Sequence, residues 1–164
     1  MTPTLEQRIA RLEAIEAIKV LKHRYLRACD HKDPEGFRAA FVARGAVVDY
    51  GPKIGRFEDA DGVTEVYRRM ALQRREGAYV VLDMHHGLHP DIEVLSGTEA
   101  RGRWTLRFRQ VTLADRMERV STIEYDDRYV VEDGAWRISS CHVRTLWTLA
   151  TPLAEGADIT ETLS

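Results

Sequence analysis

Residues 102–110, GRWTLRFRQ, decide the fold because large apolar side chains alternate there with polar ones. Trp104, Leu106 and Phe108 lie on one face of an extended chain, and the positions between them carry arginine or threonine. A period of two predicts a β-strand with one buried and one solvated face. Strands of this kind are typical of antiparallel sheets.

The neighbouring segments predict further strands. Residues 79–95, YVVLDMHHGLHPDIEVL, are apolar at both ends and irregular in the middle, which indicates a strand with a bulge or bend near Gly87 and Pro90. Residues 121–131, STIEYDDRYVV, largely keep the alternation. Asp133-Gly134 then predicts a tight hairpin leading into residues 135–149. The second half of the chain is therefore expected to be a run of antiparallel strands.

The first half predicts three helices and one strand. Apolar residues at helical spacing predict a first helix that ends near Cys29, with Thr4 and Gln7 as its capping box. Pro34 opens a second, short helix, and Asp59 or Asp61 can cap a third. Residues 45–50, GAVVDY, read as a short strand between the second and third helices.

Helices on one side of an antiparallel sheet predict an α+β fold. A strongly curved sheet over a long helix leaves a deep apolar pocket, which is the natural place for chemistry. We expect one domain over residues 1–150 and a weakly patterned tail over residues 151–164.

The composition excludes several classes of protein. The chain has 164 residues and a formal net charge of −2, so nothing suggests nucleic acid or an anionic membrane as a partner. No apolar run is long enough to span a bilayer, and the N-terminus lacks the apolar core of a signal peptide. Cys29 and Cys141 form neither a CxxC pair nor a disulfide framework. We expect a cytoplasmic protein.

Residues 83–90, DMHHGLHP, contain three histidines that could be metal ligands, a base, or ordinary surface or core residues. On a strand, His85 and His86 point to opposite faces, and His85 and His89 are about 13 Å apart. Neither arrangement closes a metal shell, so no metal is expected. A histidine base in an apolar pocket needs an acceptor for its other ring nitrogen, and a distant carboxylate would have to supply it.

Three segments carry a resemblance to a known family. They are residues 25–41, YLRACDHKDPEGFRAAF, residues 45–52, GAVVDYGP, and residues 84–104, MHHGLHPDIEVLSGTEARGRW. In this order they resemble the SnoaL-like dehydratases and scytalone dehydratase of the nuclear transport factor two-like superfamily, over about residues 5–148. The resemblance implies a cone-like fold and a histidine–aspartate pair.

Carried onto this chain, the resemblance makes Asp30 the residue that orients His85, which acts as general base and then general acid. The alignment favours His85 over His86, although a bulge near Gly87 could shift the register by one. Tyr25 is either a pocket residue or core packing. Tyr50 either donates a hydrogen bond to substrate or fills the wall.

Four strand residues complete the candidate site. Arg144 is expected to stabilise negative charge if its face of the last strand borders the cavity; otherwise it faces solvent. His142 shares that face and is a candidate for substrate contact. Trp104 and Phe108 are further candidates, and Trp104 stands where scytalone dehydratase has a second pocket histidine.

The sequence therefore predicts a cofactor-free lyase, a dehydratase acting on a bulky apolar substrate such as a steroid, polyketide or other polycyclic molecule. An isomerase of the ketosteroid type, a non-catalytic ligand-binding or assembly module, and a water-activating hydrolase are the alternatives. A homodimer or homotrimer is expected through the outer sheet face, where Trp147, Val143 and Phe108 would otherwise expose apolar surface.

Overall fold

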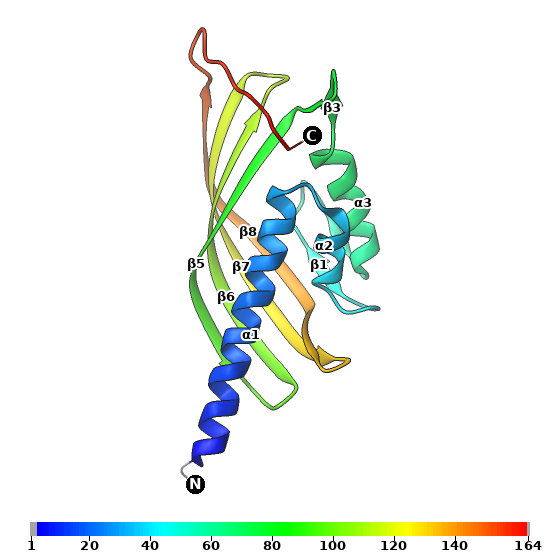
Figure 1. Cartoon of the computed structure of the whole chain (residues 1–164), viewed down its shortest axis with the longest axis vertical. Coiled ribbons are helices and arrows are strands. Elements are labelled where there is room, and N and C mark those ends of the chain that lie inside the picture. Colours follow the sequence, from blue (N-terminus) through cyan, green and yellow to red (C-terminus); the bar gives the residue numbers. More distant parts are fainter. Residues whose placement is uncertain (1–2, 164) are drawn as a thin grey trace.

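The computed structural model describes residues 3–163, which form helices packed against a strongly curled sheet (Figure 1). The helices are α1 (Leu5–Asp30), α2 (Pro34–Ala39) and α3 (Ala60–Ala71). The main sheet has the strand order β2-β1-β8-β7-β6-β5. Its strands are β1 (Val47–Asp49), β2 (Arg56–Phe57), β5 (Val81–Val94), β6 (Glu99–Thr112), β7 (Met117–Glu132) and β8 (Ala135–Pro152). A separate small ribbon pairs β3 (Arg74–Arg75) with β4 (Ala78–Tyr79).

The α+β class predicted from the sequence is confirmed, but the sheet is mixed rather than wholly antiparallel. Strands β5 to β8 follow one another in antiparallel hairpins, as the alternation predicted. Strand β1 instead runs parallel to β8, with Val48 opposite Cys141. These two strands come from distant parts of the chain, so no hairpin fixes their relative direction.

Local signals in the sequence set the helix boundaries. The Thr4–Gln7 capping box is present at the start of α1. Asp33 caps α2, with Pro34 in the first turn, where proline is tolerated. Of the two aspartates proposed for α3, Asp59 is the cap, and its side chain accepts the backbone N–H of Gly62.

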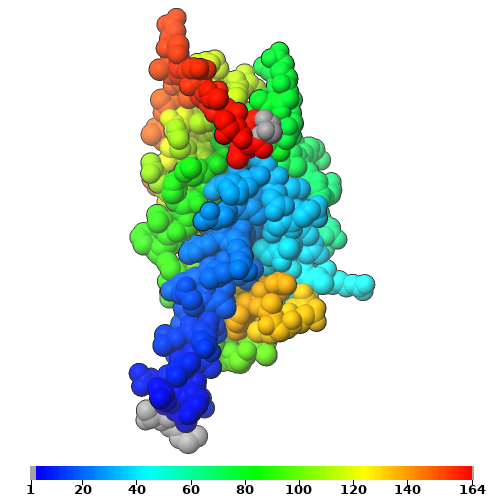
Figure 2. Space-filling view, viewed as in Figure 1, coloured from blue at the N-terminus to red at the C-terminus, as the bar shows by residue number. Residues whose placement is uncertain are grey.

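Only the second half of α1 packs on the sheet. Ile18, Leu26 and Cys29 are buried in the core, whereas Leu5 and Leu12 are exposed. The first turns of the helix extend beyond the body of the molecule (Figure 2). The apolar spacing at the N-terminus therefore forms a helix, as predicted, without a surface of the same chain to cover it.

The predicted irregularity in β5 is a register shift between Leu88 and Asp91. His89 lies within it and adopts a positive φ of 51°. Just before the shift, Gly87 lies against α1, and a Cβ there would come within 2.7 Å of Leu26 Cδ1. The missing side chain allows α1 to approach β5 closely, two residues from His85.

The segment after β8 turns back along the molecule. The backbone N–H of Leu153 donates to the carbonyl of Arg116 at 2.8 Å. Further along, the Glu161 carboxylate accepts the backbone N–H of Tyr79 at 3.1 Å. Across residues 3–163, the structure contains no helix with the length and apolar character needed to cross a membrane.

Candidate active site

Asp30, the last residue of α1, holds His85 of β5 at two points. Its Oδ1 lies 2.6 Å from Nδ1 of the His85 ring and also accepts the His85 backbone N–H at 3.0 Å. The side chains of His85 and Asp30 are 14% and 25% exposed, so water only partly screens the pair. The contact joins two segments that are far apart in the sequence.

This contact defines the tautomer of the histidine. A carboxylate only accepts hydrogen bonds, so Nδ1 carries the proton and Nε2 keeps a free lone pair. The ring is further fixed by Phe108, whose ring centroid lies 4.7 Å away. The His85 ring is thereby held with Nδ1 hydrogen-bonded to Asp30 and with Nε2 free to accept a proton.

The other two histidines of the segment lie elsewhere. His86, opposite Arg107 on β6, and His89, in the register shift, are both exposed. Within residues 3–163, no three His, Cys, Asp or Glu side chains are grouped in a way that could hold a metal ion. Elemental analysis of the purified protein tests the prediction that no metal is bound.

His85 borders a cavity of about 140 Å³ between the helices and the sheet. Most of its walls are apolar or aromatic, with a few polar groups. The lining residues are Tyr25, Cys29, Phe37, Tyr50, Ile54, Val63, Val66, Tyr67, Met70, Ala71, Asp83, His85, Phe108, Gln110 and Tyr125. Of the residues proposed from the sequence, His85, Tyr25, Tyr50 and Phe108 meet here.

Tyr25 and Tyr50 form a hydrogen-bonded pair of hydroxyl groups at the cavity. Burial raises the pKa of both phenols well above the ordinary value, so both remain protonated. One hydroxyl hydrogen joins the pair, and Tyr125 and Cys141 also lie beside these two hydroxyl groups. Tyr25 and Asp30 lie on different sides of α1. Tyr25 lines the cavity, whereas Asp30 does not line it and contacts Nδ1 of His85.

Asp83 and Gln110 are the carboxylate and the amide among the cavity residues that were missed in the sequence. Asp83 and Gln110 lie two residues from His85 and Phe108, so strand alternation puts them on the same face. The Gln110 amide donates to Asp83 Oδ1 at 3.0 Å, and Lys32 Nζ lies 2.6 Å from Asp83 Oδ2. Alternation could have identified Asp83 and Gln110, but no local pattern marks Lys32 as their partner.

Trp104 is buried but does not line the cavity. Its indole N–H donates to the Tyr129 hydroxyl at 3.0 Å, and His23 of α1 packs edge-on against its ring. The side chain thus fills the core under α1. The expectation that Trp104 contacts the substrate is therefore corrected: Trp104 packs in the core.

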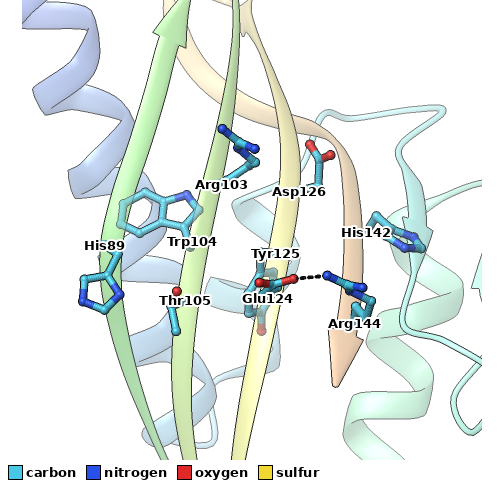
Figure 3. Close-up of a pocket in the computed structure, with 9 residues that line it drawn as sticks. All are labelled: His89, Arg103, Trp104, Thr105, Glu124, Tyr125, Asp126, His142 and Arg144. Carbon is cyan, nitrogen blue, oxygen red and sulfur yellow. Dashed lines mark hydrogen bonds and ion pairs between the residues drawn. The ribbon is translucent and has the colours of Figure 1, made fainter. Parts of the chain in front are cut away.

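Arg144 and His142 lie on the outer face of the sheet, away from the cavity (Figure 3). Arg144 pairs with Glu124 at 2.5 Å, and His142 Nδ1 lies 3.5 Å from Asp49. The prediction that they face the cavity is wrong because β8 contains an extra residue. Tyr129 pairs with Ile138 whereas Arg128 pairs with Ser140, so the alternation changes face between them.

Comparison with known proteins agrees with this architecture. The SnoaL-like domain model matches residues 10–142. A Novosphingobium aromaticivorans protein provisionally named a scytalone dehydratase is similar at a TM-score of 0.74 and 23% identity, covering 92% of this chain and 99% of its own. A hexachlorocyclohexane dehydrochlorinase, LinA type 2, is similar at 0.75 and 18%, covering 93% and 97%.

An NTF2-like protein from Pseudomonas putida is similar at a TM-score of 0.63 and 16% identity, covering 80% of this chain and 86% of its own. At these identities the similar structures show the fold alone. The family model spans well over half of the chain, from Ala10 in the second turn of α1 to His142 in β8. The protein therefore belongs to the family of SnoaL-like domains and has the cone-like NTF2-like fold.

Proposed function

We propose that this protein is a cofactor-free lyase that eliminates water from an organic substrate. The observation that carries the proposal is the Asp30–His85 contact beside a largely apolar cavity. A dehydratase and a dehydrochlorinase, the activities named for two similar structures, both remove a proton and a leaving group from neighbouring atoms. A buried, oriented base serves that step.

In the proposed reaction, Nε2 of His85 removes a proton from a carbon beside a carbonyl group. Asp30 stabilises the imidazolium that forms. A hydroxyl group of the Tyr25–Tyr50 pair turns its hydrogen toward the carbonyl oxygen and stabilises the negative charge that develops there. The electrons of the broken C–H bond then form a C=C bond as the neighbouring C–O bond breaks. The leaving hydroxyl takes the proton from His85 and departs as water.

An isomerase on the same site is the second candidate. The same base and the same hydroxyl pair would serve it, because the two reactions differ only in where the proton is returned. Transfer to another carbon keeps the mass of the substrate, whereas elimination lowers it by the mass of one water. A non-catalytic binding module would not need the Asp30–His85 contact, which disfavours that reading.

A mass-spectrometric screen of β-hydroxy ketones for the loss of water tests the proposal. One such probe is 3-hydroxycyclohexanone, whose product, 2-cyclohexenone, is also detected by its ultraviolet absorbance. On a compound that reacts, His85→Ala should lower the rate by roughly 10²–10⁴-fold. His86→Ala removes the same group from the opposite face and should leave the rate unchanged. Full activity of His85→Ala, or inactivity of His86→Ala alone, would refute the assignment.

A further inference from the structure

The cavity has a second polar side, formed by Asp83 and Gln110. Both oxygens of Asp83 have partners: Oδ1 accepts the Gln110 amide, and Oδ2 contacts Lys32 at 2.6 Å. The Lys32 side chain is fully buried and that of Asp83 is 6% exposed. Lys32 therefore neutralises the charge of Asp83 within the protein, and Asp83 has little capacity left to bind another molecule.

Gln110 keeps hydrogen-bonding groups free. A primary amide has two N–H donors and a carbonyl acceptor, and one N–H is used by Asp83. For the rest of the amide, no protein hydrogen bond is present among residues 3–163. Since Gln110 also lines the cavity, these free groups are positioned to bind an oxygen-bearing group of a ligand, by donation or acceptance.

The strand register places His85 between the two polar sides. Along β6, Trp104 pairs with Tyr125, Phe108 pairs with His85, and Gln110 pairs with Asp83. Tyr125 and the Tyr25–Tyr50 pair border the same cavity. Tyr125 and Gln110 therefore come from strand positions on either side of Phe108 and its partner His85.

We propose that Gln110 determines substrate specificity, and that the substrate is a compact molecule with two separate oxygen groups. One oxygen, a carbonyl, binds the tyrosine pair, and the second binds the Gln110 amide. The cavity of about 140 Å³ supports the size limit, because sites for drug-sized ligands usually enclose about 300–1,000 Å³. This inference rests on the lyase proposed above, and it replaces the bulky polycyclic substrate expected from the sequence with a small one.

Binding can be measured without turnover, using two probes that differ by one oxygen. The affinities of cyclohexanone and 4-hydroxycyclohexanone are determined by titration with NMR detection. The native protein should bind the hydroxylated probe roughly three- to tenfold more tightly, as one added hydrogen bond provides. Gln110→Met has nearly the same volume without the amide, and it should bind both probes equally. Gln73→Met makes the same change at an exposed amide and should keep the native preference.

Equal binding of the two probes by the native protein, or an undiminished preference in Gln110→Met, would overturn the inference. So would a four-ring steroid ketone that binds as tightly as 4-hydroxycyclohexanone and competes with it. Gln110→Asn retains an amide on a shorter side chain. If Gln110→Met does not fold, a weakened preference of Gln110→Asn for the hydroxylated probe supports the inference instead. A Gln110-dependent preference without any elimination would overturn the lyase while supporting the two-oxygen ligand.

Discussion

Lys22 Nζ and Asp127 Oδ2 lie 2.7 Å apart, and both side chains are completely shielded from solvent. The same carboxylate oxygen accepts the Tyr129 hydroxyl at 2.8 Å, and the lysine lies 3.6 Å from the centroid of the Tyr125 ring. The ion pair thus joins α1 to β7 in the core. A charge in this place is stable only while its partner is present.

Replacing one partner should therefore lower the free energy of unfolding far more than replacing both. Lys22→Met should lower the free energy of unfolding by about 3–5 kcal/mol, because it leaves the Asp127 carboxylate buried without its cation. The double variant Lys22→Met/Asp127→Leu should recover much of this loss. Urea unfolding followed by circular dichroism measures all three proteins.

The pair of Lys19 and Glu16 on α1 is a matched control. Their 3.4 Å contact is exposed, so Lys19→Met should change the free energy of unfolding by less than about 1 kcal/mol. Equal losses for Lys19→Met and Lys22→Met would contradict the importance of burial.

A second prediction concerns the orienting carboxylate. Asp30→Asn replaces an acceptor by an amide that can donate to Nδ1, which would move the His85 proton to Nε2 and remove the base. The turnover rate should fall by roughly 10²–10⁴-fold, while the melting temperature changes little. Asp33→Asn is the control, because Asp33 only caps α2 and asparagine is an equally good cap. An Asp30→Asn protein with native turnover would remove Asp30 from the mechanism.

A third prediction follows from the buried phenols and thiols. Burial raises the pKa of Cys29 and Cys141, and also that of Tyr25, Tyr50, Tyr125 and Tyr129. In the unfolded chain, thiols lose their protons near pH 8.5 and phenols near pH 10. The unfolded state then binds fewer protons than the folded state, so the free energy of unfolding falls as the pH rises.

The loss should begin above about pH 8.5, and each thiol should contribute about 2 kcal/mol of it between pH 8 and pH 10. Urea titrations at the two pH values measure the change. In the double variant Cys29→Ala/Cys141→Ala, the part of the stability loss that comes from the thiols should disappear. The smaller part that comes from the tyrosines should remain. The same pH dependence in the double variant and the native protein would contradict this account.

Strand and helix positions could be predicted from the sequence because they depend on local chemistry. The alternation around Trp104 and the cap at Thr4 act over a few residues, and the structure has the expected elements at both places. The closeness of Asp30 and His85 was implied only by the family resemblance, since no spacing relates residues 55 apart. Their contact depends on how α1 lies across the sheet.

The errors have equally physical causes. One extra residue in β8 reverses the faces of His142 and Arg144, and no local signal marks that bulge. Lysine side chains are rarely fully buried, yet Lys32 and Lys22 are buried against partners on strands far along the chain. Val143, expected on the outer face, packs inward because of the same extra residue in β8. Phe108 was named for both the cavity and the outer face, and it lies at the cavity.

The outer face of the sheet still exposes apolar side chains, among them Trp147 at 55% and Leu149 at 61%. Leu149 pairs with Val120 on β7, and Met84 on β5, which is 48% exposed, lies beyond Arg109 on the same face. Monomeric proteins rarely leave large contiguous apolar patches uncovered. We therefore predict that this face binds a second copy of the chain, in a homodimer or homotrimer.

Sedimentation velocity at micromolar concentration should show the native protein as an oligomer. Trp147→Glu should shift it to the monomer, since burying an unpaired carboxylate in an interface is strongly unfavourable. Leu12→Glu tests the other exposed apolar surface, the stripe of Leu5, Ile9 and Leu12 at the start of α1, and should leave the oligomer intact. A native monomer would refute the prediction. Dissociation by Leu12→Glu but not by Trp147→Glu would move the interface from the sheet to the helix.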